Sequence, residues 1–149
     1  MAMYLEDFKV GQVIETPART VTEADVVAFA GLSGDYNPLH TDAEFCAKTP
    51  FKQRIAHGML GMSIMTGLTA RTGMLDGSAL AFLGIEDWKF QKPVFFGDTI
   101  RVRITVADVR AASKPGTGVL KRMVEIVNQR DEVAQSGHLL TLIRSRPAS

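Results

Sequence analysis

An aspartate and a histidine stand five residues apart in a segment dense in turn-forming residues, GDYNPLH over residues 34–40. Because Asn37 precedes a proline, helical backbone angles are disfavoured there, and such a turn can aim both side chains at one point. Imidazole exchanges protons near neutral pH and a carboxylate accepts or orients a proton, so the two groups suit acid–base chemistry on a water molecule. We therefore take Asp35 and His40 as candidate catalytic residues. The alternatives are a turn aspartate that bonds its own backbone and a histidine on a surface loop.

A second candidate element is the run HGML at residues 57–60, where a strongly apolar helix is predicted to begin. The first N–H groups of a helix have no partner within the helix, and the helix dipole is positive at that end. Gly58 has no side chain to block an approaching carbonyl, so its N–H is a candidate donor to a developing oxyanion. The alternative is a glycine that eases packing. We interpret His57 as structural, capping or packing the entry to the helix.

These groups must be positioned by the surrounding elements, and the first part of the chain is predicted to be mainly helical. Thr22 and Asp25 form a capping-box pattern ahead of a short helix, and Asp42 is suited to cap a helix over 43–48. A helix over about 58–71 is apolar around most of its circumference, which is typical of a buried helix.

After residue 78 the patterns are mainly those of strands. In 99–108, apolar residues alternate with arginine and threonine, as in a half-buried antiparallel strand. Strands are expected over 12–20, 79–90, 99–108, 118–128 and 132–144. A buried helix followed by long strands predicts an α+β fold in which one curved antiparallel sheet wraps around a central helix.

Composition narrows the class of protein. The 149 residues suit one domain, residues 1–149, and the net charge of +1 gives no reason to expect a nucleic-acid partner. The N-terminal residues do not resemble a signal peptide, and no apolar stretch of membrane-spanning length occurs, so we expect no membrane insertion. A single cysteine, Cys46, fits a reducing compartment and a cytoplasmic location. Three widely spaced histidines predict no metal site.

The residues around the candidate pair also carry a family resemblance. The run FAGLSGDYNPLH over 29–40, followed by HGML, resembles the MaoC-like dehydratase family and, within it, the (R)-specific enoyl-CoA hydratases. The segment PVFFGDT over 93–99 is similar to that family's strand-entry segment. The resemblance extends over roughly residues 5 to 144. It implies a single hot-dog domain.

The resemblance also implies roles and partners. Asp35 and His40 would activate water for addition to, or removal from, the C2–C3 bond of an acyl thioester, with the Gly58 N–H polarising the thioester carbonyl. Asn37 would orient His40 or bind the thioester, and Thr66 would supply a hydroxyl where relatives often have serine. No cofactor is expected beyond CoA or an acyl carrier as part of the substrate. A homodimer or dimer-based oligomer is expected.

Two other functions remain open. One is an acyl-CoA thioesterase on the same fold, although such enzymes usually lack this Asp-to-His turn. The other is a non-catalytic module that binds acyl thioesters. Such a module would have no need to bury two titratable groups beside an apolar tunnel for the acyl chain.

Overall fold

One antiparallel sheet forms most of the molecule in the computed structural model, which describes residues 2–147. Its strands lie in the order β1-β4-β5-β6-β3, and β2 also pairs with β4. The strands are β1 (Val13–Glu15), β2 (Arg19–Thr20), β3 (Ala79–Phe90), β4 (Thr99–Ala111), β5 (Thr117–Val127) and β6 (Val133–Arg144). Strands β4, β5 and β6 pair along most of their length. Successive side chains of a strand point to opposite faces, so every second side chain of these strands lies on the same face of the sheet.

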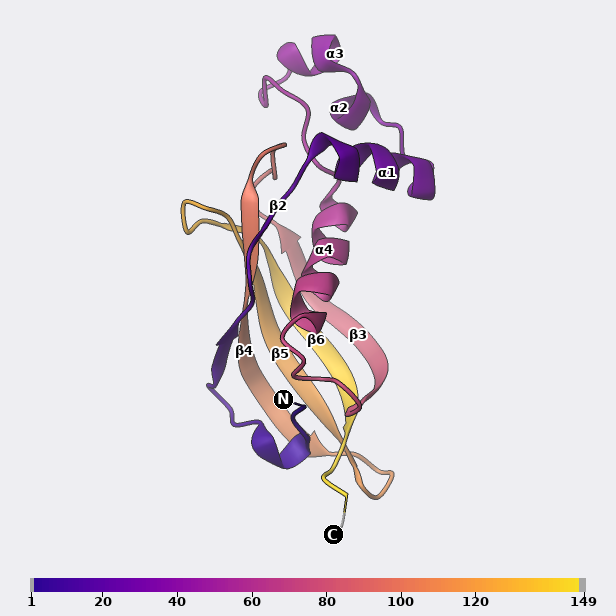
Figure 1. Cartoon of the computed structure of the whole chain (residues 1–149), viewed down its shortest axis with the longest axis vertical. Helices are drawn as coiled ribbons and strands as arrows, with labels where there is room; N and C mark the ends of the chain where they lie inside the picture. Colours follow the sequence, from indigo (N-terminus) through magenta and orange to yellow (C-terminus); the bar gives the residue numbers. More distant parts are fainter. Residues whose placement is uncertain (1, 148–149) are drawn as a thin grey trace.

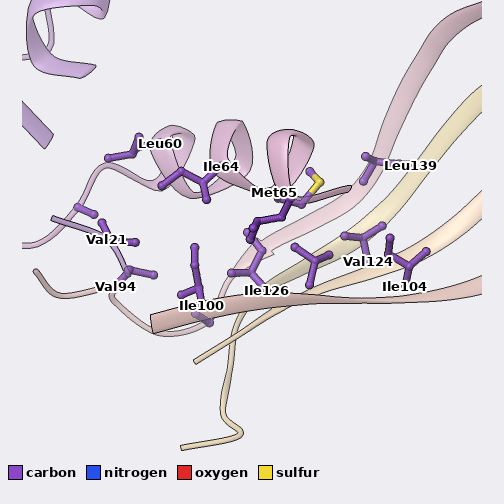
Figure 2. Close-up of a cluster of buried hydrophobic side chains, with 14 of the residues drawn as sticks. Val21, Leu60, Ile64, Met65, Val94, Ile100, Ile104, Val124, Ile126 and Leu139 are labelled. Atoms are coloured by element: carbon purple, nitrogen blue, oxygen red, sulfur yellow. The ribbon is translucent and has the colours of Figure 1, made fainter. Parts of the chain in front are cut away.

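Helix α4 (Gly58–Ala70) lies along that face, and the sheet curves around it (Figure 1). Its buried side chains pack against the inner face of the central strands (Figure 2). The core includes Leu60, Ile64 and Met65 from the helix and Ile104, Val124, Ile126 and Leu139 from the sheet. The expected α+β hot-dog arrangement, a sheet wrapped around a central helix, is therefore confirmed.

The central helix is less completely buried than its composition predicts. Met62 and Met65 are buried, but Met59 is 57% exposed, and Ser63, Thr66 and Gly67 are also exposed. The expectation of a helix buried around most of its circumference was therefore wrong at Met59, because the sheet covers one side of α4 only.

The remaining helices gather beyond the N-terminal end of α4 (Figure 1). They are α1 (Glu23–Ser33), α2 (Pro38–Thr41) and α3 (Ala43–Ala47); a short 3-10 helix, η1 (Leu5–Asp7), lies at the opposite end. The capping box at Thr22 and the cap at Asp42 are both present, as predicted. The expected strand over 12–20 is divided into β1 and β2, and Pro17 lies in the interruption.

In the part of the chain that the structure describes, strand β3 ends the sheet and pairs only with β6. Several large apolar side chains along this strand are exposed, among them Phe82, Leu83 and Ile85. An unpaired edge of this kind suits coverage by a second copy, so the expected homodimer remains a prediction. Across residues 2–147, no helix combines the length and apolar character that a membrane crossing requires.

Candidate active site

His40 is held by α2 and by the strand-like segment before α4. Asn37 caps α2, since its Oδ1 accepts a hydrogen bond from the Leu39 N–H at 3.0 Å, and Pro38 occupies the first helical position. The His40 ring lies 2.7 Å, through Nδ1, from the carbonyl oxygen of Ile55. Because a carbonyl only accepts, Nδ1 carries the hydrogen, and a neutral His40 therefore has its lone pair on Nε2.

Asp35 faces that free nitrogen. Its Oδ2 lies 4.0 Å from His40 Nε2, while its Oδ1 accepts a hydrogen bond from the Asn37 N–H at 3.2 Å. The Asp35 side chain is 53% exposed and that of His40 only 11%. The structure thus brings the two predicted catalytic residues together, with the carboxylate on the solvent side and the imidazole on the protein side.

His57, interpreted from the sequence as a structural residue, also lies in this site. Its ring stacks on His40 with the centroids 3.7 Å apart, and Phe29 packs on it at 4.9 Å. Its Nε2 donates to the backbone carbonyl of Asp35 at 2.9 Å, and the whole residue is only 3% exposed. His57 therefore touches both candidate catalytic residues, and the structural role expected for it becomes a positioning role.

Gly58 follows His57 and opens α4, with His57 as the N-cap residue. It borders a cavity of about 590 Å³, here named the Gly58 cleft, whose walls include Phe51, Ile55, Met59, Phe90 and Val94. A Cβ at Gly58 would lie 2.6 Å from the Phe90 ring, so the close approach of that ring requires glycine. The lining does not include Asp35 or His40; His40 contacts the Ile55 carbonyl, and the Asp35 carbonyl contacts His57, which precedes Gly58.

Thr66 lies apart from these groups. It is eight residues along α4 from Gly58, about 12 Å at the helical rise, and it lines a different cavity. Its hydroxyl donates to the Ser63 carbonyl at 2.7 Å. Within one chain, therefore, the structure brings together Asp35, His40, Asn37 and Gly58 but not Thr66, and the predicted role of Thr66 stays a prediction.

His40 and His57 lie close together in space, although the wide spacing of the histidines along the sequence led us to expect no metal site. Asp35, His40 and His57 offer ligand atoms that all lie within 4.8 Å of one another. However, one nitrogen of each ring already faces a backbone carbonyl. A ring lone pair lies in the plane of its ring, and two rings stacked with 27° between their planes direct their remaining nitrogens poorly at one ion.

Charges at the mouth of the Gly58 cleft are paired. Lys92 lines the cleft and forms an ion pair with Glu132, which also contacts Arg130. Hydrogen bonds from Lys92, then Arg130 and Asn128, lower the pKa of Glu132 to about 2. Arg54, which precedes Ile55 of the cleft wall, is paired with Glu23.

Comparison with known proteins adds a family. The chain matches the family described as MaoC like domain over residues 7–128. It is 39% identical over 103 residues to the (R)-specific enoyl-CoA hydratase of Rhodospirillum rubrum, a match covering 69% of each chain. It is 41% identical over 102 residues to Protein MaoC of Klebsiella aerogenes, but this match covers 68% of the present chain and only 30% of that longer protein.

Solved structures show the same fold. A protein from Archaeoglobus described as a monoamine oxidase regulatory protein is 40% identical, with a TM-score of 0.90 over 99% of this chain and 98% of that one. A Mycobacterium tuberculosis protein with a double hot-dog fold has a TM-score of 0.86 at 23% identity, covering 99% of this chain and 46% of that one. At that identity the likeness shows the fold alone.

Proposed function

Because this chain belongs to the MaoC-like dehydratase family, we propose that it is a hydro-lyase acting at the C2–C3 bond of enoyl and 3-hydroxyacyl thioesters, as an (R)-specific enoyl-CoA hydratase. The observation that carries the proposal is the spacing of 4.0 Å between Asp35 Oδ2 and His40 Nε2. That distance is too long for a direct hydrogen bond, but one water oxygen fits within about 2.8 Å of both atoms.

In the proposed reaction, the lone pair on His40 Nε2 takes one proton from this water while its oxygen bonds to C3. Asp35 accepts the other hydrogen of the water and thereby fixes its orientation. The electrons of the C2–C3 double bond move towards the thioester, whose oxygen accepts a hydrogen bond from the Gly58 N–H. The proton on Nε2 then passes to C2, so that water is added overall and His40 is neutral again.

Dehydration is the same sequence in reverse, since an enzyme lowers one barrier for both directions. The thioester itself acidifies C2, so the proposal requires no cofactor, and CoA or an acyl carrier is part of the substrate. The Gly58 cleft would receive the thioester beside the helix N-terminus. We place the enzyme in the cytoplasm as a homodimer or dimer-based oligomer joined along the exposed edge strand β3.

The proposal is tested with the purified protein and crotonyl-CoA. We expect enoyl absorbance to fall without release of free thiol, and the product to be oxidised by a dehydrogenase specific for (R)-3-hydroxyacyl-CoA. Release of thiol would instead identify a thioesterase. Binding of crotonyl-CoA without any turnover would leave only a non-catalytic module.

A further inference from the structure

A second cavity, of about 550 Å³, lies between the C-terminal half of α4, the first residues of edge strand β3, and residues of β5 and β6. We name it the Arg122 pocket; its walls include Met65, Leu75, Phe82 and Leu139. Met65 and Leu139 are drawn beside each other in Figure 2. The Gly58 cleft shares none of its lining residues, so the two cavities are separate within one chain.

Arg122 lies on β5 at a position where the alternation of buried and less buried side chains predicts a core residue. Leu120, Val124 and Ile126, which alternate with it, are fully buried on the same face. Arg122 is itself only 4% exposed, yet it lines the pocket. Removing a guanidinium from water in this way is costly unless an anion or several acceptors compensate.

The chain supplies little compensation to this cation. One guanidinium nitrogen, Nη2, donates to the Thr141 hydroxyl at 2.7 Å, and Nε has no hydrogen-bond partner among residues 2–147. None of the ion pairs formed within residues 2–147 includes Arg122. Asp76 also lines the pocket but is exposed and lies outside ion-pair distance of Arg122. Burial lowers the pKa of Arg122 to about 10, a sign of the same uncompensated charge.

A second polar group in the pocket is also left without a partner. The Thr69 hydroxyl comes from α4, is buried, and makes no hydrogen bond within the described residues. The pocket therefore combines a guanidinium and a hydroxyl, both able to form further hydrogen bonds, with apolar walls. This combination suits a planar anionic group attached to an apolar chain. Carboxylate is the anion that matches the donor fork of arginine in that setting.

We propose that the Arg122 pocket binds an organic carboxylate, with the carboxyl group on Arg122 and Thr69 and its carbon chain against the apolar walls. The ligand is a free short-chain acid, because Thr69 lies about 16 Å along α4 from Gly58, too far for a six-carbon acyl group to reach from one site to the other within one chain.

Calorimetric titration of the purified protein with hexanoate, and with hexanamide as its neutral counterpart, tests the proposal. We expect hexanoate to bind at least tenfold more tightly than hexanamide. Arg122→Met should remove that preference and leave hexanamide binding unchanged, whereas the exposed-arginine control Arg110→Met should keep it. Equal affinities for the two ligands, or an unchanged preference in Arg122→Met, would overturn the assignment.

Folding of the variant is checked separately by thermal melting. Replacing a buried, unpaired charge by an apolar side chain of similar length commonly leaves stability unchanged or raises it, so Arg122→Met should melt no lower than the parent protein. A melting temperature lowered by more than a few degrees would mean that Arg122 serves the fold, and would contradict a ligand-binding role. Thr69→Val should weaken hexanoate binding severalfold in an unaltered fold.

Turnover gives an independent check. Because the two sites are too far apart for one six-carbon acyl group, trans-2-hexenedioyl-CoA and trans-2-hexenoyl-CoA should be hydrated with similar kcat/KM, and Arg122→Met should not change their ratio. A preference of at least tenfold for trans-2-hexenedioyl-CoA that Arg122→Met abolishes would show that the pocket holds the acyl group and would overturn the assignment to a free acid. Failure of the hydratase assay altogether would refute the proposed function, and the titration would still decide this inference.

Discussion

Replacing His57 by phenylalanine separates its hydrogen bond from its ring stacking. Phenylalanine keeps a flat ring between Phe29 and His40 but cannot donate to the carbonyl of Asp35, which His57 Nε2 contacts at 2.9 Å. The lost hydrogen bond costs about 1 kcal/mol net. Against this, His57 Nδ1 is buried with no hydrogen-bond partner in the described part of the chain, and removing such a group recovers about 1–3 kcal/mol.

The sum ranges from no change to about 2 kcal/mol of stabilisation, so we expect the melting temperature of His57→Phe to lie between that of the parent protein and about 8 °C above it. Catalysis should respond differently, because the backbone of the turn that carries Asp35 loses its anchor. A displacement of about 1 Å in a catalytic group can cost about 100-fold in rate, so kcat for crotonyl-CoA should fall by about 10- to 100-fold with little change in KM. Thermal melting by circular dichroism and steady-state kinetics measure the two effects.

His57→Ala serves as the comparison, since it also removes the stacked ring and should destabilise by about 2–4 kcal/mol. Unchanged kcat in a stable His57→Phe protein would refute the positioning role. A loss as complete as that of His40→Gln would also contradict it, because His57 would then take part in the reaction directly.

Three further changes have expected outcomes. Gly58→Ala places a methyl group against the Phe90 ring and in the path of the thioester, so kcat/KM should fall by at least tenfold. The melting temperature should drop only slightly, because Phe90 is 56% exposed and can move. Asn37→Ala removes the cap on the Leu39 N–H and should cost about 1 kcal/mol, with lower kcat, and Asn37→Ser should restore both in kinetics and melting. Glu132 has a folded pKa of about 2 against an ordinary value of 4.5, so its stabilising contribution is present above pH 4.5 and is lost as the pH falls towards 2. Melting curves of Glu132→Gln should therefore lie below those of the parent at pH 7 and converge with them near pH 2; a constant difference would contradict this.

The fold could be predicted from local patterns because the strongest patterns coincide with the longest elements. The predicted helix over 58–71 and the strand over 79–90 match α4 and β3 closely. The predicted strand over 99–108 is three residues too short, because β4 continues to Ala111, where it still pairs with Gly118 of β5. Hydrogen bonding to a neighbouring strand can therefore continue a strand beyond the residues whose apolar and polar side chains alternate.

The candidate site could be predicted only in part. Asp35 and His40 share one short turn, so their proximity follows from sequence distance. The contact of His57 with both depends on the path between α3 and α4, which no local pattern specifies. Helix α2 did have a signal, since Asn37-Pro38 is a cap followed by proline at the first helical position.

The central claim is that the carboxylate of Asp35 and the imidazole of His40 act together on one water. The most direct measurement is kcat for crotonyl-CoA hydration in Asp35→Asn, with Asp42→Asn as the matched control because Asp42 only caps α3. We predict a loss of about 10²- to 10⁴-fold in Asp35→Asn, an unaltered melting temperature, and near-normal activity in the control. A correctly folded Asp35→Asn protein with undiminished kcat would contradict the account.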